Sequence, residues 1–184
     1  MRVSRNSKYI IPHLEKFYES TSYYSYSLIR FVAGAMMIPH GYGKLFVNLN
    51  GTVDFFKSVQ LEPAYPLALY IGILEFFGGI FLALGFLTRF VAIQLIGLLA
   101  VATFYIHLKN GFLWIKGGYE YPLFWLVIMI AIFFKGGGRA SIDSSLPKEF
   151  ESVFRYLNNL PLNKAVIVFL ALIAAVILLI SLYV

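Results

Sequence analysis

Hydrophobic residues along this chain gather in long windows that are almost free of charge, and polar residues gather between them. Such windows are typical of membrane-spanning helices, because about 20 apolar residues in a helix cross a hydrocarbon core ~30 Å thick. We expect five spans, over residues 26–46, 66–87, 90–108, 118–134 and 165–184. The pattern therefore predicts an all-α transmembrane protein with a four-helix membrane bundle and an additional C-terminal transmembrane helix.

The segments outside these windows divide the chain into four parts. Residues 1–25 are polar and basic and form a cytoplasmic N-terminal segment, while the membrane domain occupies residues 26–146. Residues 147–162 carry apolar side chains at helical spacing opposite charged ones. This pattern predicts an amphipathic helix on the membrane surface, with a docking helix for a partner as the alternative. The fifth transmembrane helix takes up residues 163–184.

The composition narrows the classes of function. Only 13% of the 184 residues are charged, and there is no cysteine, which excludes disulfides, thiol redox relays and thiolate metal sites. The three histidines are too scattered along the chain to predict a metal site. The N-terminus is polar and basic without an apolar core region, so we do not expect a cleavable secretory signal.

The lysines and arginines predict the orientation in the membrane. With the N-terminus inside, 11 of the 15 basic residues fall on the inner side, where the positive-inside rule favours them. The four on the outer side are Lys44, Lys57, Lys109 and Lys116. We therefore expect a multi-pass protein with its N-terminus in the cytoplasm and its C-terminus outside. The net charge of +6 then belongs mostly to this inner anchor, and nucleic-acid binding is not expected.

Ionisable residues within the spans are costly in lipid, so they are expected to face the bundle interior. In the first span His40 and Lys44 are four residues apart and share one helix face. In the second span Glu75 lies on a stripe with Gly72 and Gly79, a face suited to close helix approach. These three ionisable side chains are thus predicted to point at one another rather than at lipid.

Two further polar residues belong to the outer half of the predicted bundle. His107 ends the third span and Glu120 opens the fourth, and each by itself would more often be structural, since polar groups cost little at the interface. Together, the candidate polar pocket is His40, Lys44, Glu75, His107 and Glu120. Arg30 lies near the inner end of the first span, so we expect it to snorkel toward water or to meet an anion at the inner surface.

The sequence MIPHGYGKLF places helix-disturbing residues beside His40 and Lys44. Pro39 removes one backbone hydrogen bond from the helix interior, which predicts a kink and a freed carbonyl. Gly41 and Gly43 let a backbone or a ligand approach closely, because glycine has no side chain. The outer end of the first span is therefore a candidate wall of a pocket.

These features together resemble the DoxX family of small bacterial and archaeal membrane proteins, over about residues 28–143. The resemblance rests on three motifs: H-G-x-x-K, a glutamate followed by paired glycines, and G-R-x-S-x-D. Their residues here are His40, Gly41 and Lys44, then Glu75, Gly78 and Gly79, then Gly138, Arg139, Ser141 and Asp143. The predicted fifth span after Asp143 departs from the four-helix plan that the family implies.

The resemblance implies a location in the inner or plasma membrane of a prokaryote. It also implies a role beside redox enzymes, since family members include subunits of a thiosulfate:quinone oxidoreductase and proteins that assemble with oxidative-stress enzymes. Besides the lipid bilayer, we therefore expect protein partners or a homo-oligomer. Whether the chain is itself an enzyme stays open, because the sequence holds no endogenous electron donor.

Three functions are compatible with the buried polar residues. In the first, the chain is a quinone-linked subunit in which His40 and Lys44 donate to a quinone head group and Glu75 and His107 pass protons. In the second it is a non-catalytic scaffold in which Glu75 only ties helices together. In the third it carries protons or a small solute, although no internal repeat of the common transporter type is visible.

Overall fold

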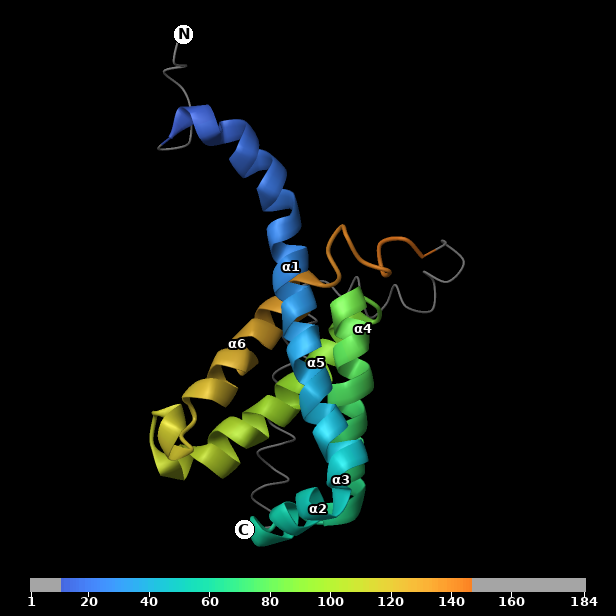
Figure 1. Ribbon diagram of the computed structural model, residues 1–184, viewed down its shortest axis with the longest axis vertical. Helices are drawn as coiled ribbons and strands as arrows, with labels where there is room; N and C mark the ends of the chain where they lie inside the picture. The colour runs from blue at the N-terminus through green and yellow to red at the C-terminus, as the bar shows by residue number, and fades with distance from the viewer. Residues whose placement is uncertain (1–10, 147–184) are drawn as a thin grey trace.

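The computed structural model describes residues 11–146, and every regular element in that range is helical (Figure 1). In chain order the α-helices are α1 (Glu15–Tyr42), α2 (Leu49–Ser58), α3 (Ala64–Ile73), α4 (Gly79–Leu84), α5 (Thr88–Ala100) and α6 (Glu120–Lys135). Short 3₁₀ turns cover Pro12–Leu14, Leu108–Asn110 and Trp114–Lys116. The amphipathic helix predicted for residues 147–162 and the transmembrane helix predicted for 163–184 lie outside the described residues.

Three π-helical segments continue or join these helices. They are Gly43–Val47 after α1, Leu74–Gly78 between α3 and α4, and Val101–His107 after α5. In a π-helix the turn is widened by one residue, so the chain stays helical while its side chains change direction. The three segments therefore lengthen the helices rather than end them.

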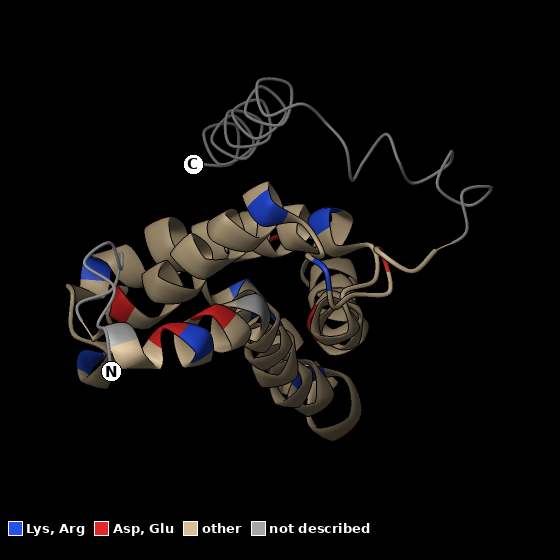
Figure 2. Cartoon of the chain, turned by 90° about the horizontal axis from the view of Figure 1, so that it is seen from above, with Lys and Arg blue, Asp and Glu red and all other residues tan. Residues whose placement is uncertain are grey.

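Two helical segments in the described part of the chain are long and apolar enough by themselves to cross a bilayer. One is Ala64–Leu84, which contains α3 and α4, and the other is Thr88–Asn110, which contains α5. These agree with the second and third predicted spans. Figure 2 shows how little of the helical ribbon carries charge.

The full set of four membrane-crossing helices in residues 26–146 is not confirmed by length and composition. α6 has 16 residues, which gives about 24 Å at 1.5 Å per residue, short of a ~30 Å hydrocarbon core. α1 is long enough, but it begins at Glu15 with a polar first half that extends away from the other helices (Figure 1). The helix therefore crosses the domain boundary expected at residue 26.

The helices associate as two close pairs that share one core. α1 lies against α4 and the π-helical segment before it, and α5 lies against α6. Apolar side chains from α4, α5 and α6 fill the space between the pairs, with Leu82, Leu95, Met129 and Ile132 among the most completely buried. α2 packs separately on α3, where Val53 and Phe56 cover Ala64 and Ala68.

Arg30 ties α1 to the end of α4. Its side chain is 2% exposed, and Nη1 donates to the carbonyls of Leu82 and Ala83 at 2.7 Å each. Nη2 donates to the carbonyl of Ala140 at 2.6 Å. The last carbonyls of a helix lack partners within it and carry partial negative charge, so a buried guanidinium satisfies them. The prediction that Arg30 snorkels toward water or meets a surface anion is therefore wrong.

The glycine-rich loop, residues 136–145, holds the same end of the molecule together. Asp143 accepts hydrogen bonds from the backbone N–H groups of Leu87 at 2.8 Å and Thr88 at 3.0 Å, and from the Thr88 hydroxyl at 2.7 Å. It thereby caps the N-terminus of α5. Arg89 donates to the carbonyl of Phe133 near the end of α6 at 3.1 Å. Asp143 of the third motif is thus structural, while Arg139 lies exposed on the loop.

Candidate functional site

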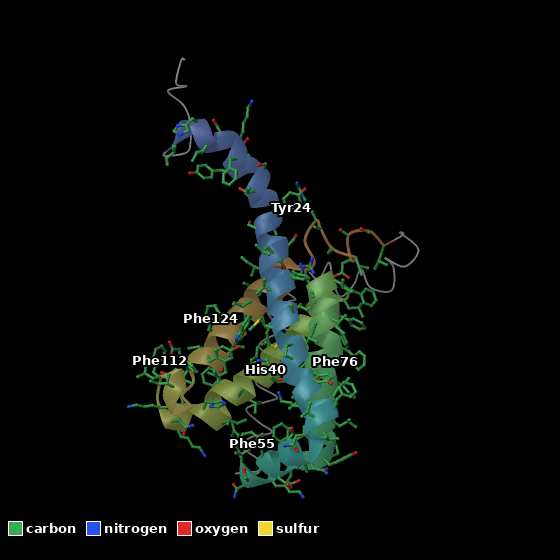
Figure 3. The ribbon with its side chains drawn as sticks, viewed as in Figure 1. Tyr24, His40, Phe55, Phe76, Phe112 and Phe124 are labelled. Carbon is green, nitrogen blue, oxygen red and sulfur yellow. The ribbon has the colours of Figure 1, made fainter. Side chains whose placement is uncertain are left out.

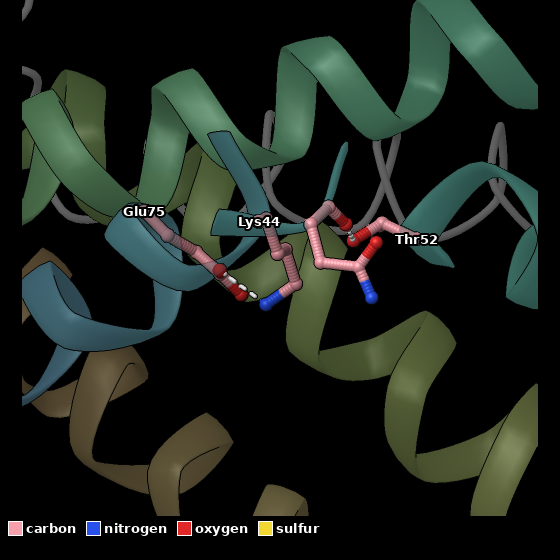
Figure 4. Close-up of polar contacts among 4 residues, drawn as sticks. Lys44, Thr52 and Glu75 are labelled. Carbon is pink, nitrogen blue, oxygen red and sulfur yellow. Dashed lines mark hydrogen bonds and ion pairs between the residues drawn. The ribbon is translucent and has the colours of Figure 1, made fainter. Parts of the chain in front are cut away.

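Lys44 and Glu75 form an ion pair between the continuation of α1 and the π-helical segment that precedes α4 (Figure 4). Nζ of Lys44 donates to Oε2 of Glu75. The Glu75 side chain is 7% exposed and that of Lys44 is 26% exposed, so the carboxylate is the more shielded partner. The buried carboxylate of Glu75 needs a partner of opposite charge, because burial away from water disfavours an unpaired carboxylate.

Three of the five candidate residues lie in the π-helical segments. Lys44 lies in Gly43–Val47, and Glu75 lies in Leu74–Gly78. His107 ends the third segment, Val101–His107. Single widened turns of this kind are rare in proteins and occur frequently at functional sites. The sequence did not predict them, because a π-turn keeps the apolar periodicity of a helix and adds only one residue.

Glycines bring the two paired residues within reach of each other. A Cβ atom at Gly41 would lie 2.7 Å from the Cα of Phe76, and one at Gly79 would lie 2.8 Å from the carbonyl oxygen of Gly34. Both approaches are too close for any side chain other than hydrogen. The close helix approach predicted at Gly41 and Gly79 is therefore confirmed. At Gly72 and Gly78 an added Cβ would meet only side chains, and at Gly43 it would meet nothing within 4 Å, so no backbone approaches these three closely.

A cavity of about 460 Å³ opens beside the ion pair, between α2 and the last turns of α1 and its continuation. It is lined by Pro39, His40, Gly43, Lys44, Asn48, Gly51, Thr52, Phe55 and Phe56. His40 and Lys44 thus line one wall together, as their shared helix face predicted. Figure 3 shows His40 on α1, well away from Phe112 at the far end of the α5–α6 pair.

Asn48 and Thr52 line the cavity but were not among the predicted site residues. Oδ1 of Asn48 accepts from the Gly51 N–H at 2.9 Å and caps the N-terminus of α2. The Thr52 hydroxyl donates to the Asn48 carbonyl at 3.1 Å. With Oδ1 engaged in the cap, the two N–H groups of the Asn48 amide can serve as donors.

His107 and Glu120 have other partners. Nδ1 of His107 donates to the Gly117 carbonyl at 2.7 Å, and Oε2 of Glu120 accepts from the Trp114 N–H at 3.1 Å. Both side chains therefore hold the connection between the α5 segment and α6. The predicted group of five accordingly divides into His40 and Lys44 at the cavity, Glu75 paired with Lys44 beside it, and two residues in this connection.

The cavity offers donors more than metal ligands. Over residues 11–146, no group of three or more His, Asp or Glu side chains stands close enough to hold a metal ion. The one carboxylate at the site is already engaged by Lys44, while His40 and the Asn48 amide face the cavity without a bond to each other. Such a set suits a neutral or anionic ligand that accepts hydrogen bonds.

The sequence of this chain is similar to those of several known bacterial proteins. It is 35% identical over 69 residues to an uncharacterized protein of Haemophilus influenzae, covering 38% of this chain and 46% of that protein, and so spans less than half of that relative. It is 29% identical over 132 residues to another uncharacterized protein of that organism, covering 68% of this chain and 93% of the relative. It is 29% identical over 116 residues to "Putative oxidoreductase CatD" of Bacillus subtilis, covering 63% and 82%.

No solved structure matches the chain. A family model does, and it covers the part of the chain that holds both members of the ion pair and all the residues that line the cavity. The family description is DoxX and its model matches residues 26–108 of this chain, which supports membership of the DoxX family of integral membrane proteins.

Proposed function

We propose that this protein is a quinone-linked membrane subunit of an oxidoreductase complex, and that the cavity beside Lys44 and Glu75 receives the quinone head group. The observation that carries the proposal is a donor-lined cavity next to a shielded ion pair. The DoxX family membership and the oxidoreductase name of one relative support it. Electrons would come from a partner protein, since the chain has no cysteine.

The residues at the cavity fit such a ligand. A quinone head group has two carbonyls that need hydrogen-bond donors, and His40, Lys44 and Asn48 can supply them. The faces of Phe55 and Phe56 suit a flat ring. A volume near 460 Å³ lies within the usual range of ligand pockets, about 300–1,000 Å³. When bound, a quinone supplies two-electron chemistry coupled to two protons.

In this assignment the chain's own groups position the ligand and hold protons. Lys44 keeps a proton at Nζ against Oε2 of Glu75, and the carboxylate balances its charge. The side chain of Lys44 is exposed enough to reach the cavity, whereas that of Glu75 is not. Lys44 is therefore the member of the ion pair that donates to the ligand, and Glu75 sets where Nζ lies.

The test is to purify the protein from native membranes, extract bound quinone, and then measure quinone binding by variants. Lys44→Ala and His40→Ala should each weaken quinone binding at least tenfold, because each removes a donor. Lys57→Ala is the matched control, since Lys57 is an exposed lysine of α2 that does not line the cavity. Unchanged affinity in a variant that combines His40→Ala with Glu75→Ala would show that the site assignment is wrong.

A second candidate function is a non-catalytic scaffold, and the ion pair itself favours it. Polar contacts between helices stabilise membrane proteins by about 0.6 kcal/mol on average, so Lys44 and Glu75 need no ligand to be useful. A scaffold should copurify with soluble redox enzymes while binding no quinone. Its Lys44→Ala variant should then lose stability but keep its partners.

We also propose the placement of the chain in the cell. The N-terminus lies in the cytoplasm, α1 and α6 complete four spans with the two apolar segments, and the membrane is the inner or plasma membrane of a prokaryote. The excess of basic residues on the inner side supports this orientation. The bacterial sources of the relatives support the assignment of the membrane.

A further inference from the structure

The connection between the α5 segment and α6 exposes an unusual run of apolar side chains. Four consecutive residues are about half exposed or more: Phe112 at 52%, Leu113 at 48%, Trp114 at 63% and Ile115 at 69%. We call residues 108–119 the apolar loop. It follows directly on the apolar segment Thr88–Asn110, and it lies toward the same end of the molecule as α2 (Figure 1).

Several backbone groups of the apolar loop are hydrogen-bonded within the connection itself. Tyr119 N–H donates to Gly111 at 3.0 Å and Glu120 N–H donates to Phe112 at 3.0 Å. The carbonyl of Leu113 accepts from both Lys116 and Gly118 at 3.1 Å. Irregular backbone can enter an apolar medium only if its polar groups find such internal partners.

Side chains complete this pairing at the points where the backbone turns. The Gly117 carbonyl accepts from Nδ1 of His107 at 2.7 Å and from Nδ2 of Asn110 at 3.0 Å. The Trp114 N–H is taken by the carboxylate of Glu120. His107 and Glu120 thereby have a role that explains their position without a pocket.

The charges around the apolar loop suit one kind of surface. Lys109 and Lys116 flank the four apolar residues and are exposed, and there is no aspartate or glutamate from residue 108 to residue 119. Basic side chains with an exposed tryptophan between them match a phospholipid interface, where phosphate groups lie above the acyl chains. A water-exposed loop would instead be expected to carry polar residues at its tip.

We propose that the apolar loop inserts into the membrane interface as a rigid anchor. Phe112, Leu113, Trp114 and Ile115 enter the boundary between head groups and acyl chains, while Lys109 and Lys116 contact lipid phosphates. His107 and Asn110 pair the Gly117 carbonyl in that medium, and Glu120 pairs the Trp114 N–H. The proposal is independent of the quinone assignment, because it uses none of the residues that line the cavity.

The chain offers a direct probe of this anchor, since it has two tryptophans and Trp125 is buried in the core. A Trp125→Phe variant leaves Trp114 as the sole tryptophan. It would be reconstituted in phosphatidylcholine vesicles whose acyl chains carry bromine either near the head group or near the chain end. Trp114 emission should be quenched at least twofold more by the shallow bromines and be protected from aqueous iodide.

Strong iodide quenching of Trp114 with no quenching by either brominated lipid would overturn the proposal and leave the loop as a water-exposed surface for a protein partner. If Trp125→Phe fails to fold, Ile115→Cys carrying an environment-sensitive fluorophore gives the same depth measurement, because the chain has no other cysteine.

A second pair of variants tests the role of Glu120. Glu120→Ala leaves the Trp114 N–H without its acceptor, so iodide quenching of Trp114 should rise severalfold as the loop turns toward water. Glu120→Gln keeps an acceptor oxygen and should behave like the parent. Equal iodide quenching in the parent and in Glu120→Ala would show that Glu120 does not hold the loop in the membrane.

Discussion

At the scale of single residues, charge burial decides which side chains matter. Glu75 and Arg30 are both nearly inaccessible, and each is matched by a different kind of partner. Glu75 faces the ammonium of Lys44, whereas Arg30 faces three backbone carbonyls. In the pair with Glu75, Lys44 remains partly exposed toward the cavity. Arg30, in contrast, is itself buried where it donates to its three carbonyl partners. This difference separates a candidate ligand site from a structural contact.

The closed contact of Arg30 gives a prediction about stability. Arg30→Met removes donors from the carbonyls of Leu82, Ala83 and Ala140 while keeping an unbranched apolar side chain. Each buried polar group left unsatisfied costs about 1–3 kcal/mol, and three carbonyls are affected. Local relaxation recovers part of this cost, so we expect the free energy of unfolding to fall by roughly 2–4 kcal/mol. Denaturant unfolding of the protein in detergent measures it.

The control for this prediction is Lys135→Met. Lys135 is an exposed basic residue in the last turn of α6, so its replacement should change the free energy of unfolding by less than about 0.5 kcal/mol. Equal losses in the two variants would mean that the buried hydrogen bonds of Arg30 contribute nothing specific.

At the scale of the helices, glycines and π-turns place the site. The α1–α4 contact is close enough that Gly34, Gly41 and Gly79 leave no room for a Cβ atom. The widened turns at Lys44 and Glu75 then direct their side chains at each other across this contact. The capping of α5 by Asp143 holds the other end of the same bundle. Helix ends and helix contacts therefore fix the geometry of the cavity wall.

Gly41 and Gly43, both in the segment MIPHGYGKLF, give a matched test of this packing. A Cβ at Gly41 meets the backbone of Phe76, whereas a Cβ at Gly43 meets nothing within 4 Å. Gly41→Ala should therefore lower the free energy of unfolding by roughly 1–3 kcal/mol through overpacking. Gly43→Ala should be neutral or stabilising by up to about 1 kcal/mol, because alanine favours helix. Thermal melts of both variants in the same detergent would decide, and a reversed order would contradict the packing.

At the scale of the whole molecule, the helices divide into two that qualify as spans by themselves and two that do not. α1 carries Arg30 and His40, and α6 is short, so each would need neighbouring helices to be accommodated in a bilayer. The pairing of α1 with α4 and of α5 with α6 supplies those neighbours. If α1 and α6 cross the membrane as proposed, their insertion is thus a property of the bundle more than of each helix.

The absence of cysteine makes the proposed orientation easy to test. Ser58→Cys at the end of α2 and Ser145→Cys in the glycine-rich loop are both exposed positions. A maleimide that cannot cross membranes should label residue 58 in intact cells and residue 145 only after permeabilisation. The reverse pattern would place the N-terminus outside.

The sequence by itself determined the helical class, the apolar segments Ala64–Leu84 and Thr88–Asn110, and the shared face of His40 and Lys44. These depend on local periodicity and composition, which a single chain displays without its neighbours. The close approach at Gly41 and Gly79 was predictable, since only glycine permits it, but the sequence did not separate these two positions from Gly43 and Gly72.

Only the tertiary structure decided which polar groups meet. Arg30 finds carbonyls of α4 and of the glycine-rich loop, His107 and Glu120 hold the apolar loop, and Asn48 joins His40 at the cavity. In each case the side chain meets a backbone group or lines the cavity. The positions of these backbone groups and of the cavity depend on the π-turns and on how the helices cross. A linear sequence carries no such information, because one widened turn redirects every side chain that follows it.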